Sequence, residues 1–181
     1  MDFIFEYKNS FSDLFCDDLI TYFNDKSEFH EFNDIHKGGI DRTDTYLSCQ
    51  HHKSYNENFK PIVDYVLTKH VNELSNKFIF PRKWKITGHK LQKSENGGGF
   101  KNWHIEYNYD YTELATRVLT WSIYLNDVDS GFTDFKFQNK SVKSEKGTLV
   151  IWPAYFTHEH RASTELKSDK YILTGWVNYE R

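Results

Sequence analysis

The chain reads Thr120-Trp121-Ser122-Ile123-Tyr124-Leu125, then Asp127-Val128-Asp129-Ser130-Gly131, then Phe132-Thr133-Asp134-Phe135-Lys136-Phe137. The first and third segments are rich in aromatic and β-branched residues, which is typical of β-strands. The middle segment concentrates the Asp, Ser and Gly residues that favour turns. We therefore predict two strands joined by a turn, and this pattern decides the class of fold.

The same β-type pattern extends over the second half of the chain. From about residue 78 onward, short apolar runs alternate with Gly, Asn, Asp and Ser. The glycine-rich run Asn96-Gly97-Gly98-Gly99 is a clear break between two of these runs. The expected strands cover residues 84–91, 100–107, 120–125, 132–137, 148–152, 158–162 and 170–179.

Two helices are expected in the first half of the chain. Residues 12–24 place apolar side chains on one face, and Ser12 is suited to cap the N-terminus of that helix. Residues 57–76 also carry apolar side chains at helical spacing. Pro61 falls in the first turn of this second helix, where a missing N–H group costs little.

Helices followed by strands predict an α+β fold in a single domain. At 181 residues the chain is long enough for one sizeable core but not for a second full domain. We expect helical support from about residues 1–77 and a β core from about residues 78–181. That core is expected to be a double-stranded β-helix of the jelly-roll or cupin-like kind.

The composition argues against several classes of protein. Aromatic residues make up 18% of the chain and only 3 prolines occur, so a large apolar core is expected and disorder is not. A net charge of −3 gives no basic surface for phosphate, so nucleic acid is not an expected partner. Two cysteines, Cys16 and Cys49, form neither a disulfide framework nor a zinc-ribbon pattern.

The sequence also carries no sign of secretion or of a membrane span. The N-terminal residues lack the basic start and long apolar core of a signal peptide. No apolar run reaches the length of about 18 residues that a transmembrane helix needs. We therefore expect a cytoplasmic protein in a reducing setting.

The segment Trp103-His104-Ile105-Glu106 offers an imidazole and a carboxylate two residues apart. On a strand, residues at this spacing point to the same face, so His104 and Glu106 are placed to hold one metal ion. A further histidine would complete the 2-His-1-carboxylate set that binds non-heme Fe(II). A His-x-Glu tripeptide also arises by chance, and a hydrogen-bonded histidine without a metal is the alternative.

A second group of candidates lies in the C-terminal part. After Trp152-Pro153, the run Thr157-His158-Glu159-His160-Arg161 supplies two histidines, and either can be the distal ligand. Further on, Lys170 opens an apolar strand, where an inward-facing ammonium group is costly unless it is paired. A dicarboxylate co-substrate would supply that pair.

These blocks together resemble the 2-oxoglutarate- and Fe(II)-dependent dioxygenases of the prolyl 4-hydroxylase-like group, particularly their small bacterial and phage members. The resemblance covers about residues 85–179. Its blocks are His104-Ile105-Glu106, the segment from Arg117 to Tyr124-Leu125-Asn126-Asp127, Gly131-Phe132-Thr133-Asp134-Phe135, and the distal histidine followed by Lys170. This sequence departs from the family pattern in two ways: Glu106 replaces the commoner Asp, and Ser130 replaces a glycine.

The resemblance implies a role for each matching residue. His104, Glu106 and His158 would bind iron, and His158 is preferred over His160 because the family's ligand follows the proline at that distance. Lys170 would pair with the distal carboxylate of 2-oxoglutarate, and Tyr124 would help to hold it. Thr174, on the same strand face as Lys170, is expected to assist in holding the co-substrate, and Trp176 is expected near the metal.

The resemblance further implies hydroxylation of a C–H bond coupled to decarboxylation of 2-oxoglutarate to succinate and CO2. Fe(II) and 2-oxoglutarate are the implied cofactor and co-substrate, with ascorbate as a further candidate. A prolyl residue in a peptide or protein is the expected substrate, and a small molecule is the alternative. Three alternatives remain open: a cupin-like metalloenzyme of another reaction type, a non-enzymatic jelly-roll binding module, and an oxygenase that acts on a nucleobase.

Overall fold

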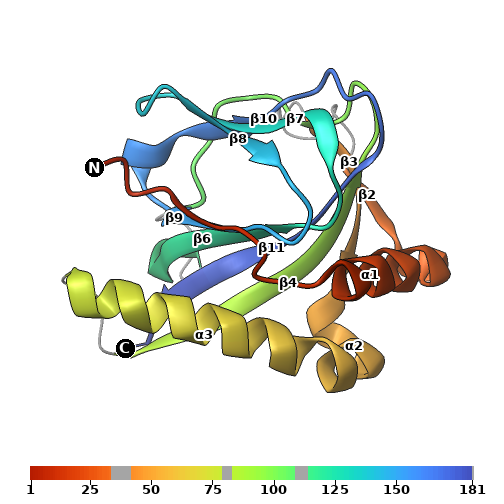
Figure 1. Cartoon of the computed structure of the whole chain (residues 1–181), viewed down its shortest axis with the longest axis horizontal. Helices are drawn as coiled ribbons and strands as arrows, with labels where there is room; N and C mark the ends of the chain where they lie inside the picture. The colour runs from red at the N-terminus through yellow and green to blue at the C-terminus, as the bar shows by residue number, and fades with distance from the viewer. Residues whose placement is uncertain (34–41, 79–82, 109–113, 181) are drawn as a thin grey trace.

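The structure is a computed structural model that describes residues 1–33, 42–78, 83–108 and 114–180. Two antiparallel sheets form the core, and the helices lie against the outer face of the larger sheet (Figure 1). Such an arrangement buries one face of the larger sheet under helices and leaves its other face toward the smaller sheet.

The larger sheet contains eight of the strands in the described residues. Its order is β1 (Phe5–Tyr7), β9 (Leu149–Pro153), β6 (Arg117–Tyr124), β11 (Lys170–Tyr179), β4 (Trp84–Ser94), β3 (Arg42–Ser48) and β2 (Glu31–Asn33), and β5 (Gly99–Phe100) pairs with β3. The smaller sheet has the order β10 (His160–Ala162), β7 (Val128–Phe135) and β8 (Lys140–Ser144).

The helices are α1 (Asp13–Asp25), α2 (Lys53–Asn58) and α3 (Lys60–Lys77). Ser12 caps α1 as predicted, since its hydroxyl accepts a hydrogen bond from the Phe15 N–H group at 3.2 Å. The expected helix over 57–76 is α3, with Pro61 in its first turn. Short 3-10 turns occupy Ser27–Phe29, Cys49–His51, Leu114–Thr116 and Phe156–His158.

Several expected strand boundaries are wrong. Of the expected strand 100–107, only Phe100 is in a ladder, as the second residue of β5, and His104 contributes a single isolated bridge. The expected turn at 127–131 is largely part of β7, where a register shift between Val128 and Phe132 absorbs the polar residues as a bulge.

The first part of the chain is not only helical support. Strands β1, β2 and β3 lie before residue 78 and belong to the larger sheet, and β8 was also not expected. β1 pairs with β9, so the N-terminal segment forms one edge of the larger sheet.

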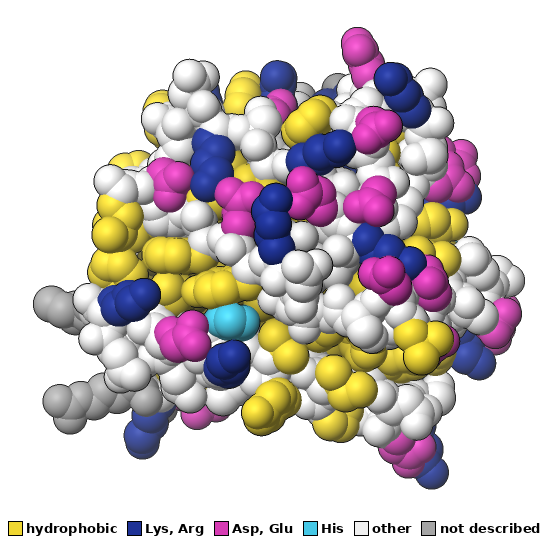
Figure 2. All heavy atoms as spheres, in the orientation of Figure 1, with side chains coloured by type: hydrophobic (Ala, Val, Ile, Leu, Met, Phe, Trp, Pro, Cys, Tyr) yellow, Lys and Arg dark blue, Asp and Glu magenta, His cyan; other side chains and the backbone are white. Residues whose placement is uncertain are grey.

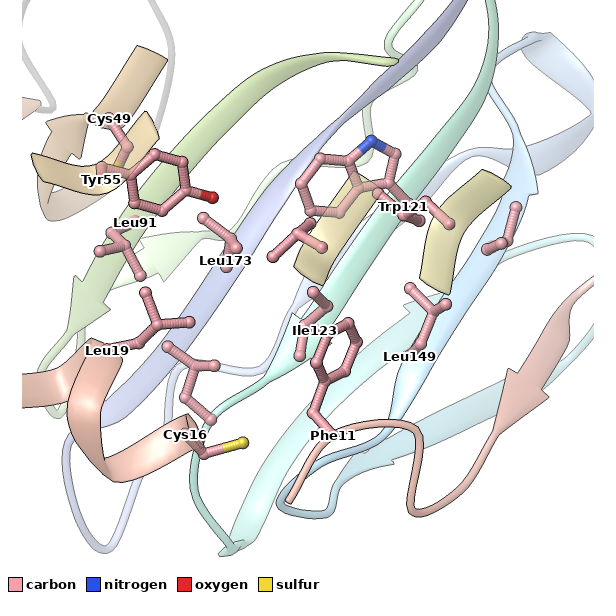
Figure 3. Close-up of a cluster of buried hydrophobic side chains, with 14 of the residues drawn as sticks. Phe11, Cys16, Leu19, Cys49, Tyr55, Leu91, Trp121, Ile123, Leu149 and Leu173 are labelled. Atoms are coloured by element: carbon pink, nitrogen blue, oxygen red, sulfur yellow. The ribbon is translucent and has the colours of Figure 1, made fainter. Parts of the chain in front are cut away.

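Alternation along β6 separates the helix-facing core from the interior between the sheets. Trp121 and Ile123 are fully buried in the cluster that also contains Leu19 of α1 and Leu173 of β11. Figure 3 shows these side chains on one face of the sheet, with Leu19 coming from α1. Thr120, Ser122 and Tyr124 alternate with them and point to the other face of the sheet. The helices therefore cover the apolar face, and the polar face is left to line an interior space.

The outer surface shows no concentration of one charge on the face drawn in Figure 2, where basic and acidic side chains are interspersed. Both cysteines, Cys16 and Cys49, are buried free thiols. Among the described residues, no helix is long and apolar enough to cross a membrane.

Candidate active site

His104 and His160 are held opposite each other by backbone hydrogen bonds. The N–H group of each residue donates to the carbonyl oxygen of the other at 3.0 Å. His104 Nδ1 donates to the Asn102 carbonyl oxygen, and His160 Nδ1 donates to the His158 carbonyl oxygen, both at 3.0 Å. Since a carbonyl oxygen only accepts, each Nδ1 carries the proton and each Nε2 presents a lone pair.

Both Nε2 atoms face the same oxygen of Glu106. Glu106 Oε1 lies 3.6 Å from His104 Nε2 and 3.7 Å from His160 Nε2. Burial works against the charged form of Glu106, but the electrostatic effect of the two neighbouring imidazoles outweighs it and holds the pKa of the carboxyl group well below its ordinary value. Burial lowers the pKa of His160, so this imidazole is neutral at pH 7.

The three side chains fit a transition-metal site. Their ligand atoms all lie within 4.8 Å of one another. Two imidazole nitrogens and one carboxylate oxygen form the donor set of the non-heme Fe(II) facial triad. Histidine ligands typically donate their second ring N–H to a backbone carbonyl, and His104 and His160 both do so.

In the structure, His160 rather than the preferred His158 lies with His104 and Glu106. His158 Nε2 instead bonds the Asp2 carbonyl oxygen at 2.8 Å, and its Nδ1 lies 2.9 Å from the Thr157 hydroxyl. The 3-10 turn Phe156–His158 is the reason, because it delays the start of β10 until His160. Only from there does the chain pair with β7 and reach His104.

Lys170 is almost wholly buried, with 5% of its surface exposed. Its ammonium group donates to the Phe132 carbonyl oxygen at 3.2 Å and lies 5.2 Å from the centre of the Tyr124 ring. Burial lowers the pKa of Lys170 to about 8, against a smaller opposing effect of Asp134. No carboxylate of the described residues lies within salt-bridge distance of this ammonium group, and a buried charge without such a partner favours the binding of an anion.

The other expected residues surround these groups. The Tyr124 hydroxyl is 2.7 Å from the Thr133 hydroxyl, so it is already hydrogen-bonded on the inner side of β7. Thr174 donates to the Trp121 carbonyl oxygen at 2.7 Å and accepts from Ser122 at 2.9 Å. Trp176 Nε1 donates to Glu106 Oε2 at 2.9 Å, which places this residue beside the histidine–glutamate cluster.

A single cavity of about 450 Å³ contains both the histidine–glutamate cluster and Lys170. Most of its walls come from β4, β6, β7, β10 and β11, the strands of the two facing sheets. Sequence reasoning assigned no role to several lining residues, of which the most important is Arg117 at the start of β6. The sequence signal for Arg117 was its position at the start of the family-like segment that runs to Tyr124-Leu125-Asn126-Asp127. The lining side chains include His104, Glu106, Arg117, Thr133, His160 and Lys170.

A sequence model of the 2OG-Fe(II) oxygenase superfamily matches residues 89–178. That range includes all three clustered side chains and Lys170. No curated protein matches the chain in sequence.

Solved structures of prolyl hydroxylases are similar over nearly the whole chain. A viral collagen prolyl hydroxylase from Paramecium bursaria Chlorella virus-1, solved with 2-oxoglutarate, is 19% identical with a TM-score of 0.71, covering 98% of this chain and 97% of that one. A Pseudomonas putida prolyl-4-hydroxylase is 14% identical with a TM-score of 0.62, covering 99% and 94%.

A Trichoplax adhaerens prolyl hydroxylase, solved with a peptide fragment of the hypoxia inducible factor oxygen degradation domain, is 16% identical with a TM-score of 0.70. The alignment covers 99% of this chain and 84% of that one. At identities this low, the structural similarity establishes a shared fold. The expected α+β double-stranded β-helix is thereby confirmed.

Proposed function

Since the chain belongs to the 2OG-Fe(II) oxygenase superfamily, we propose that His104, Glu106 and His160 bind Fe(II) and that Lys170 binds 2-oxoglutarate. The protein is a 2-oxoglutarate-dependent dioxygenase. The observation that carries the residue assignment is the presence of a metal-type donor cluster and a buried ammonium group in one cavity.

When bound, the iron activates dioxygen, so that decarboxylation of 2-oxoglutarate to succinate and CO2 is coupled to hydroxylation of a substrate C–H bond. The protein's own contribution begins with ligand orientation. The hydrogen bonds from Nδ1 of His104 and His160 fix both imidazole tautomers with Nε2 available as donor. No proton has to leave either ring before it binds a metal.

Lys170 supplies charge complementarity for the distal carboxylate of the co-substrate. A buried ammonium attracts an anion far more strongly than an exposed one, because little water screens the pair. The Tyr124 and Thr133 hydroxyls, which are hydrogen-bonded to each other, form a polar boundary next to this position. Lys170 would thus hold one end of the co-substrate, and the 2-oxo acid end would lie toward His104, Glu106 and His160.

For the substrate, we propose a prolyl residue within a peptide or protein. The proposal is supported by the fold shared with the viral, Pseudomonas and Trichoplax prolyl hydroxylases, the last of which was solved with a peptide. Arg161 lines the cavity, and its guanidinium lies 4.5 Å from the centre of the exposed Trp103 ring, so the two side chains are candidates for contact with a bound peptide.

The experiment combines two measurements on the purified protein with Fe(II) under air. Succinate formation from 2-oxoglutarate tests the reaction, and a mass gain of one oxygen atom on proline-rich peptides tests the substrate. We expect both in the wild type and neither in His160→Ala. Failure to bind or convert 2-oxoglutarate would overturn the site assignment. Succinate formation that responds only to small molecules would overturn the prolyl substrate alone.

A further inference from the structure

We propose that Arg117 and Trp176 form a clamp that positions Glu106 as a metal ligand through one oxygen atom only. The proposal rests on the metal-binding function proposed above and goes beyond it, because it assigns a task to two residues that touch no metal. Both are positioning residues that act through Glu106.

The two clamp residues meet at the same carboxylate oxygen. Trp176 Nε1 donates to Glu106 Oε2 at 2.9 Å, and an Arg117 guanidinium nitrogen donates to that oxygen at 3.2 Å. The same nitrogen of Arg117 also donates to the Glu106 backbone carbonyl oxygen at 3.0 Å. Arg117 therefore holds both the backbone and the side chain of the glutamate.

The clamp is itself a packed unit. The central carbon of the Arg117 guanidinium lies 3.4 Å from the centre of the Trp176 ring, which is the geometry of a cation–π stack. Arg117 begins β6 and Trp176 lies in β11, and these two strands are neighbours in the larger sheet. Glu106, by contrast, lies in the irregular segment between β5 and β6. A rigid sheet thus fixes a residue whose own backbone is not in a strand.

The division of labour between the two carboxylate oxygens follows from these contacts. Oε2 accepts from two donors, one of them charged, and so it is engaged on the side away from the histidines. Oε1 is left facing His104 Nε2 and His160 Nε2. A carboxylate held in this way presents one ligand atom rather than two, and the metal keeps more open positions for co-substrate and dioxygen.

The clamp also explains how glutamate serves where the related family pattern has aspartate. The additional methylene gives Glu106 one more rotatable bond, and this freedom must be lost when the side chain binds a metal. Arg117 and Trp176 restrict the side chain in advance. Partners of this kind typically change metal affinity by about 10- to 100-fold when they are removed.

The test uses Co(II) as the probe metal, with titration calorimetry for its affinity and visible absorption for its coordination geometry. Trp176→Phe removes the N–H donor and keeps an aromatic ring under the guanidinium. Arg117→Lys keeps the positive charge and removes the planar stack. Trp84→Phe is the matched control, because Trp84 is a partly buried residue of β4 that does not line the cavity.

We expect Trp176→Phe and Arg117→Lys to weaken Co(II) binding by about 10-fold or more and to change the Co(II) spectrum, with Trp84→Phe unchanged. Glu106→Asp should also weaken binding, because the shorter side chain cannot reach both the clamp and the metal. If the clamp acts through this carboxylate, adding Trp176→Phe to Glu106→Asp causes little further loss.

The outcomes distinguish failure of the clamp from failure of the proposed metal site. Wild-type affinity and an unchanged spectrum in both clamp variants would overturn the clamp and leave metal binding intact. A wild-type protein that binds neither Co(II) nor Fe(II) would overturn the metal site itself. If Trp176→Phe does not fold, as judged by thermal unfolding of the metal-free protein, Arg117→Lys decides by the same criterion.

Discussion

Replacing Lys170 with Met should stabilise the ligand-free protein and at the same time weaken its affinity for 2-oxoglutarate. Lys170 is 5% exposed, and burial lowers its pKa from 10.5 to about 8. The difference between these pKa values corresponds to ~3 kcal/mol that disfavours the charged side chain at neutral pH. Methionine has a similar length and no charge to desolvate. We therefore expect the free energy of unfolding at pH 7 to rise by about 1–3 kcal/mol.

The effect on binding has the opposite sign because the co-substrate carboxylate is the partner that the ammonium lacks. Removing one member of a buried charge pair costs about 2–5 kcal/mol. At 1.4 kcal/mol for each tenfold change, the dissociation constant for 2-oxoglutarate should rise by about 30-fold or more. A role in ligand binding predicts both a more stable fold and a lower affinity for this one ligand, and few other roles of Lys170 predict both.

Two assays measure the two effects. Urea unfolding at pH 7, without metal or co-substrate, reports stability, and anaerobic titration calorimetry with Fe(II) reports 2-oxoglutarate affinity. Lys93→Met is the control, since Lys93 pairs with Glu95 and Asp169 and does not line the cavity. Unchanged 2-oxoglutarate affinity in Lys170→Met would refute the assigned role. A fall in stability would refute the claim that its charge is costly when no ligand is bound.

Three further results are expected. Affinity for 2-oxoglutarate should fall by up to tenfold per pH unit above about pH 8, because Lys170 loses its proton there. Over the same range the stability of the ligand-free protein should rise, because the unfolded chain binds more protons than the folded one. Calorimetric titration at several pH values measures the affinity: a flat profile in the wild type would contradict this prediction, whereas Lys170→Arg should give a flat profile. His160→Ala should abolish Co(II) binding, whereas His158→Ala should retain it and lower stability by about 1 kcal/mol through the lost bond to Asp2, and the reverse pattern would restore His158 as the ligand. Gly175→Ala should destabilise the protein by about 1–3 kcal/mol, because its Cβ would meet the Thr87 carbonyl oxygen and the Trp121 ring, and an unchanged melting temperature would contradict that clash.

The elements that follow from sequence are those whose own pattern specifies their burial. Helix α1 was predictable because its cap and apolar face are local features of residues 12–24. The long strand β11 was predictable because residues 170–179 form one apolar run, which begins at Lys170. Local pattern suffices where one face of an element packs on the core.

The expectations that failed depend on distant partners. The segment around His104 has a strand-like composition, yet its backbone hydrogen bonds go to two separate residues, His160 and Ala154, so no ladder forms. The choice between the two distal histidines depends on a 3-10 turn at Phe156–His158, and spacing from a proline does not reveal that turn. The role of Arg117 required knowing that Trp176, on a neighbouring strand, would stack beneath it.

The alternation along β6 also bears on how readily this protein can acquire new substrates. Trp121 and Ile123 hold the sheet against the helices, whereas Thr120 and Ser122 line the cavity and contribute nothing to that apolar layer. A mutant library limited to Thr120, Ser122 and the cavity-lining Ile172 would change pocket shape and leave the apolar layer beneath the helices intact. One face of β6 thus holds the residues that stabilise the fold, and the other holds residues that shape the cavity. This separation makes the sheet a favourable starting point for directed evolution.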